Sequence, residues 1–592
     1  MNRPRRLKLK EAMDLILNAN DSECDGDIES EESDVDFSVE DANVDGADSS
    51  DDDSVPDSDD DKPLAKFVGA SITECSVNSK VRKKHYTWRK GAFSPPDVAF
   101  TGELPQPPDE ISSPLDYFRQ FISADMLTLL VEHTNLYSVQ KNGRAVDTSI
   151  KEVEKILGIF LLMGIVRMPG VRYYWESETR YHPVADVIAR NRFQKLLTVF
   201  HFVDNFSITD EVKAGDRLWK LRPWLEAFRQ NCLKVIPDEV NSIDEMMVPY
   251  KGRTSRLKQY MRGKPHPWGF KIWARTGVCG ILHDFDVYQG NVSNNRSELG
   301  LSGDVVLKLT STLEMGHNYK IFADNFFTST GLIEKLLERD IHYTGTVRSG
   351  RLPGCQLKDD KTLSKEGRGS FDSCVLSEPK LVAVRWFDNR PVTLASTFVG
   401  PLPLQKVRRW EKRSRSYCEI DRPAIVDRYN HCMGGVDLLD AFIAQYRFQL
   451  RSRRWYMYLF WHTVTMALIN GWLVYRRDCR LLGIPSKEIM KRRHFESHVG
   501  SSLILVNADV NHKRGRPSID ERKTAQSARK KARKGPSPDV QLDSVGHWPE
   551  KTNKRGRCAL CTKGYTDTAC QKCTVRLCFS AQRNCFKQYH GV

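Results

Sequence analysis

The sequence predicts a multidomain protein of mixed α/β class, and three observations support this prediction. The chain has 592 residues, more than a single hydrophobic core accommodates. Residues 239–346 alternate between strand-like and helical runs, whereas the segments on both sides show helical periodicity. The last 47 residues concentrate cysteine and histidine. We therefore expect an α/β core between two helical segments, followed by a metal-binding module.

Apolar periodicity gives the order of the elements. Helical spacing of apolar positions precedes the sheet, at residues 150–166, 184–205 and 217–235. The middle of the chain then reads strand–strand–strand–helix–strand–helix–strand, at residues 240–250, 269–274, 281–288, 303–315, 319–323, 329–339 and 341–347. This order is that of an RNase H-like fold with a mixed sheet. Two further strands are expected at 381–387 and 392–398.

Changes of composition along the chain set the domain boundaries. We expect an all-α domain that is split around an RNase H-like core, and the core itself carries an insertion. From the N-terminus we predict a disordered acidic region at 1–110, the first helical part at 111–238, the first part of the core at 239–346, the insertion at 347–415, the second part of the core at 416–440, the second helical part at 441–510, a basic linker at 511–545 and a cysteine-rich zinc-binding cross-brace module at 546–592.

Charge is distributed unevenly along the chain, whose net charge is +14. Residues 21–61 hold 20 acidic side chains and no basic ones, which leaves +34 on the remainder. So acidic a segment buries too little apolar surface to fold. It is either a solvating tail or a regulator that competes with a polyanion or accepts phosphates on its serines. The basic remainder indicates nucleic acid as the partner.

The sequence disfavours secretion and membrane insertion. The apolar stretch at residues 12–17 is too short for a signal peptide, and the longest clean apolar run, 156–166, is about half a membrane span. Residues 459–475 contain several polar side chains, so we expect a buried helix there rather than a span. We expect no membrane partner. Nine of the fifteen cysteines are scattered, which fits a reducing compartment.

Four aspartates on the expected core form the first candidate site. Asp244 stands inside an apolar strand-like run, where a charge is costly, and Asp324 ends another strand. Asp437 and Asp440 are spaced i, i+3, on one face of a helix that follows Gly435. Each aspartate alone is more commonly a turn former or a cap. Together such carboxylates can hold two Mg²⁺ ions, which activate a nucleophile and stabilise the leaving oxygen of a phosphodiester.

The motifs around these residues resemble those of the piggyBac transposase family. They are SIDEMMVPYKG at 242–252, RGKP at 262–265, GFK at 269–271, FADNFFTS at 322–329, GTVR at 345–348 and YNHCMGGVDLLD at 429–440. The resemblance extends from about residue 114 to 592. It implies that Asp244, Asp324 and Asp437 are catalytic and that Asp440 is a fourth carboxylate associated with the metal.

The resemblance implies cut-and-paste DNA transposition with two Mg²⁺ ions and no protein nucleophile. In such a reaction water hydrolyses one strand at the transposon end, and the freed 3′-OH attacks the other strand to form a hairpin. The reopened end then attacks a TTAA target. The implied partner is double-stranded DNA, as terminal repeats and as target, and a homodimer suits two DNA ends. A second hypothesis is a domesticated, non-catalytic DNA-binding or chromatin protein that keeps the fold.

The C-terminal cysteines form the second candidate site. Two Cys-x2-Cys pairs have the spacing of structural zinc sites, and three further ligands follow them. Because Zn²⁺ takes four ligands, seven are awkward, and a histidine at the place where the family has one supplies the eighth. The loop between the pairs is short for a ubiquitin-ligase RING. We expect two Zn²⁺ ions in a cross-brace, with the sharing of ligands left open, held by His547, Cys558, Cys561, Cys570, Cys573, Cys578, Cys585 and His590.

Basic segments supply further expected DNA contacts. Residues 513–517 have the form of an AT-hook, in which Arg514 and Arg516 lie in an A·T-rich minor groove, or they belong to a solvated linker. Residues 528–534 read as a nuclear localisation signal, so we expect a nuclear protein. Arg262 and Lys264, on the loop between the first two core strands, are placed to contact phosphates near the metals.

The start of the long apolar helix is the last candidate. Trp455 follows Arg453 and Arg454 and comes shortly after the expected catalytic aspartates. Its ring either belongs to the core or stacks on a flipped base or a hairpin end, and the family uses a tryptophan in this region. We expect these three residues to contact DNA.

Overall fold

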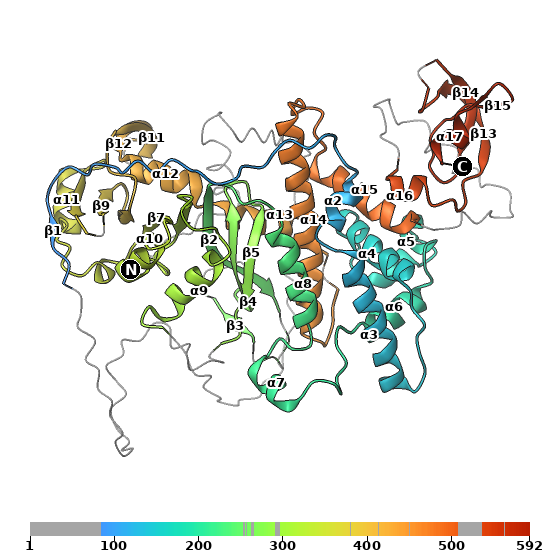
Figure 1. Ribbon diagram of the computed structural model, residues 1–592, viewed down its shortest axis with the longest axis horizontal. Coiled ribbons are helices and arrows are strands. Elements are labelled where there is room, and N and C mark those ends of the chain that lie inside the picture. The colour runs from blue at the N-terminus through green and yellow to red at the C-terminus, as the bar shows by residue number, and fades with distance from the viewer. Residues whose placement is uncertain are drawn as a thin grey trace.

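The computed structural model describes residues 85–506 and 536–591, apart from positions 251, 253–254, 256, 262–265, 291–296, 379, 412–413, 449 and 562. The acidic window, the AT-hook-like motif and the localisation signal lie outside the described residues, as do the predicted DNA contacts Arg262, Lys264, Arg514 and Arg516. The sheet occupies one half of the molecule and helices occupy the other, with the C-terminal module at the far end (Figure 1).

A ten-stranded mixed sheet forms the α/β half. Its central strands are β2 (Val240–Pro249), β4 (Trp268–Gly277), β5 (Leu282–Val287), β6 (Lys320–Ala323) and β7 (His342–Thr346). They lie in the order β5–β4–β2–β6–β7, with β6 parallel to β2 and to β7 and the other pairs antiparallel. Helices α9 (Gly300–Thr310) and α10 (Thr330–Leu337) precede β6 and β7. The predicted succession of core elements is confirmed, with boundaries shifted by a few residues.

The strands of the predicted insertion continue the same sheet. β10 pairs antiparallel with β7, and β9, β8 and β1 follow outward. The boundary expected at residue 415 falls in the turn of a hairpin, β11–β12. Composition could not reveal this continuity, because strand pairing joins segments about 50 residues apart. The elements are β1 (Trp88–Arg89), β3 (Gln259–Tyr260), η3 (Ser349–Arg351), α11 (Asp360–Glu366), β8 (Phe371–Leu376), β9 (Leu381–Phe387), β10 (Pro391–Ser396), β11 (Gln405–Glu411) and β12 (Ser416–Arg422).

Part of the N-terminal region that we expected to be disordered is ordered. The Trp88 indole Nε1 donates to the carbonyl of Pro353 at 3.0 Å, and the Lys320 ammonium donates to the carbonyl of Val98 at 2.7 Å. The ring of Phe100 packs edge-on against Tyr319, with centroids 5.0 Å apart. The predicted disordered region is therefore too long. Its last part runs along the sheet (blue trace in Figure 1). It is ordered because β8 pairs with its backbone and because its few aromatic rings pack against the core.

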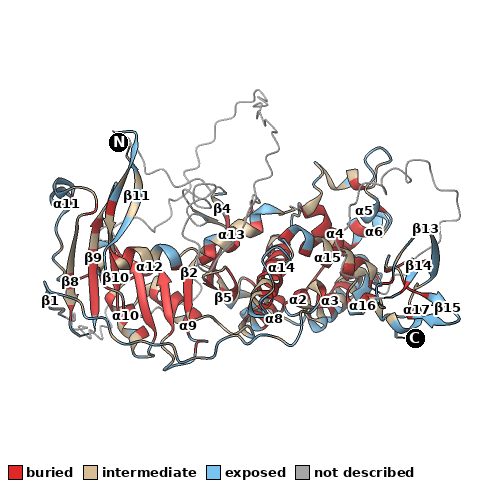
Figure 2. Cartoon of the chain, turned by 90° about the horizontal axis from the view of Figure 1, so that it is seen from above, coloured by how far each residue is buried: buried red, intermediate tan, exposed pale blue. Residues whose placement is uncertain are grey.

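Helices from before and after the sheet pack together. A Cβ on Gly158 of α4 would stand 2.6 Å from the Gly500 carbonyl of α15, so these two helices meet backbone to backbone. Buried residues run the length of α14 (Figure 2), whose Asn470 side chain bonds both backbone groups of Leu282. The helices are α2 (Pro114–Arg119), α3 (Ala124–Asn142), α4 (Ile150–Ile165), η2 (Val171–Tyr174), α5 (His182–Ala185), α6 (Arg190–Val199), α7 (Asp210–Gly215), α8 (Arg222–Leu233), α14 (Tyr456–Leu481) and α15 (Arg492–Leu505).

The two faces of the sheet are buried against different partners. Met246 and Ile272 belong to a core that they share with the helices, whereas Ile243 and Trp273 belong to a core with α9 and α10. Strand alternation produces this division. The buried helix expected at 459–475 is α14, and none of the helices in the described ranges is long and apolar enough to span a bilayer.

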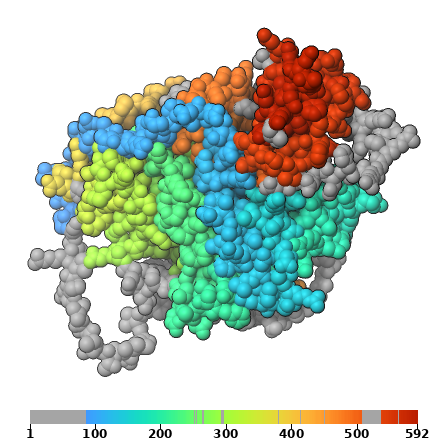
Figure 3. Space-filling view, turned by 45° about the vertical axis from the view of Figure 1, so that its right-hand side comes forward, coloured from blue at the N-terminus to red at the C-terminus, as the bar shows by residue number. Residues whose placement is uncertain are grey.

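The C-terminal module is a small lobe with its own core (red in Figure 3). An ion pair of 2.8 Å between Arg119 and Asp539 joins its first helix to α2. Its elements are α16 (Pro538–Gln541), β13 (Pro549–Arg557), β14 (Tyr565–Cys570), β15 (Phe579–Ser580), β16 (Arg583–Asn584) and α17 (Cys585–Tyr589).

Candidate functional site

Asp244 and Asp324 lie on neighbouring parallel strands at the same edge of the sheet. Strands β2 and β6 pair in register up to Ile243 and Ala323, so each aspartate is the next residue on its strand. Adjacent strands are about 5 Å apart, which makes the two aspartates neighbours. By alternation the Asp244 side chain shares a face with Ser242, away from the α9 and α10 core.

The third aspartate comes from a helix that packs on this face. Helices α12 (Ala424–Cys432) and α13 (Gly435–Gln445) follow the β11–β12 hairpin, and Asp437 lies exposed in the first turn of α13. A Cβ on Gly435 would stand 2.3 Å from the Gly277 carbonyl oxygen and 2.7 Å from the Ser242 Oγ. Only glycine permits this close approach. The contact puts the start of α13, and with it Asp437, beside the β2 face that carries Asp244.

Tyr429 on α12 lies among the three carboxylates. Burial raises the pKa of its hydroxyl, and the charges of Asp244, Asp324 and Asp437 raise that pKa further, although a hydrogen bond with Thr346 opposes the rise. Because the charges of all three carboxylates act on one hydroxyl, the three side chains lie in the neighbourhood of Tyr429. Sequence reasoning assigned no role to Tyr429, because nothing in its local pattern distinguishes it from a core tyrosine.

Asp324 is the aspartate whose ionisation the fold disturbs most clearly. Burial raises its pKa, and the nearby charge of Glu245 adds to the rise. The Phe326 amide N–H, 2.8 Å from Oδ1, and the Arg348 guanidinium act in the opposite direction. A carboxylate in such surroundings gains from a bound cation. Glu245 and Arg348 stand beside predicted site residues, but no local pattern in the sequence indicates that they lie near Asp324.

Asp440 lies about one turn beyond Asp437 on α13. Burial lowers the pKa of Arg447, and the charge of Asp440 opposes that change, so the two side chains are close. The charge of Asp440 is therefore partly balanced by the guanidinium group.

The carboxylate donor set suits a hard divalent cation, because Mg²⁺ prefers oxygen ligands. Among the described residues, however, the sets of three or more ligand atoms within 4.8 Å of one another are two Cys/His groups, and the aspartates are not among them. Like charges repel in the absence of a cation. Cation binding would therefore draw these side chains closer together.

The predicted DNA contacts at the start of α14 differ in what they touch. The Arg454 guanidinium donates to the carbonyls of Leu197 and of Phe200, the latter at 2.7 Å, and thereby fastens α14 to the end of α6. Trp455 is half-buried and packs edge-on against Phe270. Arg453 is exposed. Of the three, Arg453 has the accessibility that a phosphate contact requires.

The eight C-terminal ligands sort into two groups of four, and within each group the ligand atoms lie within 4.8 Å of one another. The groups interleave along the chain, as a cross-brace requires. This division answers the question that the sequence left open. One group is His547, Cys570, Cys573 and His590, and the other is Cys558, Cys561, Cys578 and Cys585.

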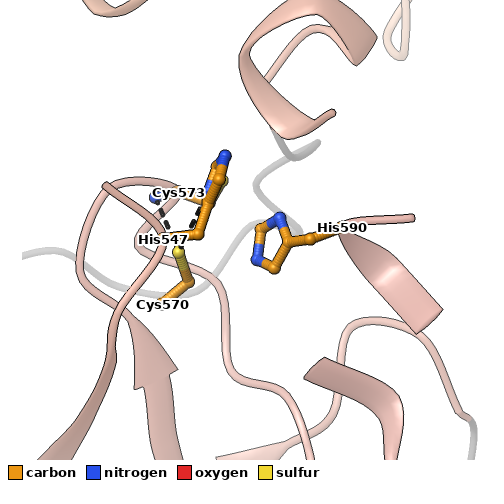
Figure 4. A group of neighbouring side chains, drawn as sticks. All are labelled: His547, Cys570, Cys573 and His590. Atoms are coloured by element: carbon orange, nitrogen blue, oxygen red, sulfur yellow. Dashed lines mark hydrogen bonds between the residues drawn. The ribbon is translucent and has the colours of Figure 1, made fainter. Parts of the chain in front are cut away.

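In the mixed group, each histidine has one ring nitrogen placed to bind a metal ion and the other in a hydrogen bond (Figure 4). The Nδ1 of His547 lies 3.4 Å from the sulfurs of Cys570 and Cys573, while its Nε2 bonds Asp543 at 2.9 Å. The Nδ1 of His590 bonds the Gln541 carbonyl at 2.8 Å, which leaves the buried Nε2 without a partner among the described residues. Such second bonds fix the tautomer of metal-binding histidines.

In the all-cysteine group the sulfur atoms pack directly against the backbone of Gly564. The sulfurs of Cys561 and Cys578 are 3.7 Å apart. A Cβ on Gly564 would stand 2.3 Å from the Cys578 sulfur and 2.7 Å from the Cys561 sulfur, so no larger residue fits. Four thiolates, or two thiolates with two imidazoles, make a soft donor set of the kind that holds tetrahedral zinc.

Comparison with known proteins shows relatives along most of the chain. The family model described as Transposase IS4 matches residues 113–472. Human PiggyBac transposable element-derived protein 2 is 31% identical over 519 residues, 86% of this chain and 82% of that protein. Human PiggyBac transposable element-derived protein 3 is 31% identical over 525 residues, 87% of this chain and 83% of that protein.

A solved structure shares the fold. It is the cryo-EM structure of the piggyBac transposase synaptic complex with hairpin DNA, which matches with a TM-score of 0.58 at 20% sequence identity. The match covers 80% of this chain and 97% of that chain.

Proposed function

The chain belongs to the piggyBac-type transposases within the IS4 transposase family, and from this premise we propose that it is a metal-dependent DNA transposase. The observation that carries the proposal is the position of Asp244, Asp324 and Asp437, whose charges all act on the Tyr429 hydroxyl. The sheet order β5–β4–β2–β6–β7 supports an RNase H-like core around them.

Asp244, Asp324 and Asp437 would hold Mg²⁺, with Asp440 beside them. When bound, Mg²⁺ supplies the charge that activates the attacking hydroxyl and stabilises the leaving oxygen of a phosphodiester. The pairing of β2 with β6 fixes the first two carboxylates relative to each other. The close contact of Gly435 with the Gly277 carbonyl and the Ser242 hydroxyl fixes the position of the third. The raised pKa of Tyr429 keeps its hydroxyl protonated, so it can donate a hydrogen bond to a phosphate oxygen.

The steps that we propose need no covalent enzyme intermediate. Water attacks the phosphodiester at the transposon end, and the broken P–O bond leaves a 3′-OH. That 3′-OH attacks the opposite strand, which forms a hairpin and releases the flanking DNA. Water then hydrolyses the hairpin phosphodiester and regenerates the 3′-OH. That 3′-OH attacks a phosphodiester at a TTAA target, whose P–O bond breaks and releases the target's own 3′-OH.

We propose zinc for the two Cys/His groups, on the basis of their soft donors and the unpartnered Nε2 of His590. This module would read the terminal repeats. The exposed strand β13, whose sequence includes Lys554, Arg555 and Arg557, offers phosphate contacts there. A homodimer acting in the nucleus completes the proposal, and gel filtration with a tagged localisation assay tests those two parts.

Cleavage of end DNA tests the function. The full chain is incubated in Mg²⁺ with a duplex that carries candidate terminal repeats, taken from DNA flanking copies of this coding sequence, and denaturing gels report nicks and hairpins. We expect Asp244→Ala and Asp324→Ala to abolish both products while zinc content and DNA affinity stay at the parent level. Asp210→Ala, at an exposed aspartate on α7, is the matched control. Parent-like nicking by either site variant contradicts the assignment.

A second function is a non-catalytic DNA-binding protein that retains the fold. The observation that favours it is that both human relatives are named transposable element-derived proteins. In that case the parent chain binds the duplex and forms no nick or hairpin in the same assay. Asp244→Ala then leaves its DNA affinity unchanged.

A further inference from the structure

The ribbon formed by β11 and β12 projects from the sheet (Figure 2). Its inner face is anchored, because Val407, Cys418 and Ile420 pack into a core with Trp386. The Trp386 indole Nε1 donates to the carbonyl of Asp421 at 2.8 Å. The base of the ribbon is therefore held firmly on β9, and its orientation is fixed.

The outer face of the ribbon carries two large aromatic rings in solvent. Trp410 is 51% exposed and Tyr417 is 63% exposed, and they are cross-strand partners with ring centroids 5.2 Å apart. The Arg408 guanidinium lies 5.2 Å from the centre of the Tyr417 ring. Both rings therefore keep apolar area in water that contact with a partner would remove. Paired exposed aromatics beside an arginine are typical of a binding surface.

Charge identifies the partner. Residues 405–416 contain six basic side chains and one acidic side chain. The acidic residues of the outer face are Glu419, the cross-strand partner of Arg408, and Asp421, which lies toward the base and pairs with Lys406 at 2.8 Å. Arg415 is exposed in the turn beside Tyr417. The tip is thus positive and aromatic, a combination that suits the phosphates and bases of DNA.

We propose that the β11–β12 ribbon is a DNA-binding arm. The major groove of duplex DNA admits a two-stranded ribbon, so Trp410 and Tyr417 contact base edges there while Arg408 and Arg415 contact phosphates. The inference rests on the proposed function, because it adds a contact to the same DNA. It names a surface to which neither the sequence motifs nor the aspartate site assigned a role.

The covalent connection places this contact near the aspartate site. Helix α12, which carries Tyr429, begins at Ala424, two residues after β12 ends at Arg422. The strand from Tyr417 to Arg422 spans about 17 Å, and the helix from Ala424 to Tyr429 about 8 Å. The two-residue link from Arg422 to Ala424 adds about 7 Å, so the whole path is about 32 Å long. The tip therefore reaches DNA within about nine base pairs of the aspartate site, at 3.4 Å per base pair.

Fluorescence anisotropy with a labelled 30-base-pair duplex, measured on the full chain without Mg²⁺ at several salt concentrations, tests the arm. We expect the double variant Trp410→Ala/Tyr417→Ala to lower affinity about tenfold, the scale of one good contact to a base edge. Trp410→Phe/Tyr417→Phe should restore most of that affinity. Arg408→Gln/Arg415→Gln should reduce the slope of log K against log salt by about 1.8, or about 0.9 per lost phosphate contact.

Lys335→Gln, at an exposed lysine on α10, is the charge control and should leave the affinity and the slope unchanged. Hydroxyl-radical footprints of the Trp410→Ala/Tyr417→Ala and Arg408→Gln/Arg415→Gln variants should lose protection at one end only, within about nine base pairs of the nick position. Unchanged affinity and slope in both the Trp410→Ala/Tyr417→Ala and the Arg408→Gln/Arg415→Gln variants contradict the proposed DNA-binding arm, as does a change confined to self-association. Because binding is read without Mg²⁺, an absence of cleavage contradicts the catalytic proposal and leaves this test intact.

Discussion

Gly435→Ala tests how the aspartate site is assembled. The new Cβ would stand 2.3 Å from the carbonyl oxygen of Gly277 and 2.5 Å from the Thr276 Oγ1, whereas ordinary contact begins at 3.4 Å. The first of these atoms is backbone and cannot rotate away. The start of α13 must therefore move by about 1 Å, and Asp437 moves with it.

Two effects on stability oppose each other in this variant. Overpacking costs about 1–3 kcal/mol, and the higher helix propensity of alanine returns at most about 1 kcal/mol. Because Gly435 is the first residue of α13, where the propensity gain is small, we expect a net loss of about 1–3 kcal/mol in the free energy of unfolding. A displacement of about 1 Å at a reacting centre lowers rates about 100-fold, so cleavage should fall far more than stability.

Single-turnover cleavage of end DNA and thermal unfolding provide the two readouts. Gly215→Ala at the end of α7, where no atom lies within 4 Å of the added Cβ, is the control and should match the parent in both. If Gly435→Ala unfolds at the parent temperature and cleaves at the parent rate, α13 does not sit on β2 and β4 as described. The unfolding measurement decides the packing even if the parent does not cleave.

Further predictions concern the module and a buried glutamate. Gly564→Ala should lower bound zinc from two ions per chain to one, measured by atomic absorption, because its Cβ occupies the space between Cys561 and Cys578; two ions in the variant contradict this. Removal of zinc by a chelator should increase hydrogen exchange in residues 536–591 and spare the sheet, because the module has its own core; exchange spreading into the sheet contradicts this. Burial raises the pKa of Glu496 to about 7, despite the opposing charge of Arg492. The folded chain therefore keeps a proton that the unfolded chain releases above about pH 4.5, and stability falls as pH rises from about 4.5 to 7. Glu496→Gln should remove that fall of roughly 3 kcal/mol, read by denaturant titration at pH 5 and pH 8; a parent-like pH dependence contradicts it.

Much of the α/β core was predictable because its signals are local. The period-2 and period-3.6 patterns gave β2, β6 and the two helices between the parallel strands, and Asp244 and Asp324 follow from those elements. The order of residues 85–110 was not predicted, because β1 is stabilised by pairing with β8, nearly 300 residues away, and not by its own composition. Tyr429 was missed for a similar reason, since its significance lies in three carboxylates from other elements. Arg454 looked like a DNA contact in the sequence, but its guanidinium bonds carbonyls at the end of α6.

The sequence by itself determined the order of the elements and the residue types available for chemistry, because propensity, turn residues and ligand spacing act over a few positions. The tertiary structure decided which distant residues share a site. It divided eight cysteine and histidine ligands between two interleaved groups, brought Asp437 to β2 through the close contact of Gly435 with Gly277, and extended the core sheet with the strands of the insertion. These are contacts across long stretches of chain, and only the packing of whole elements against one another selects them.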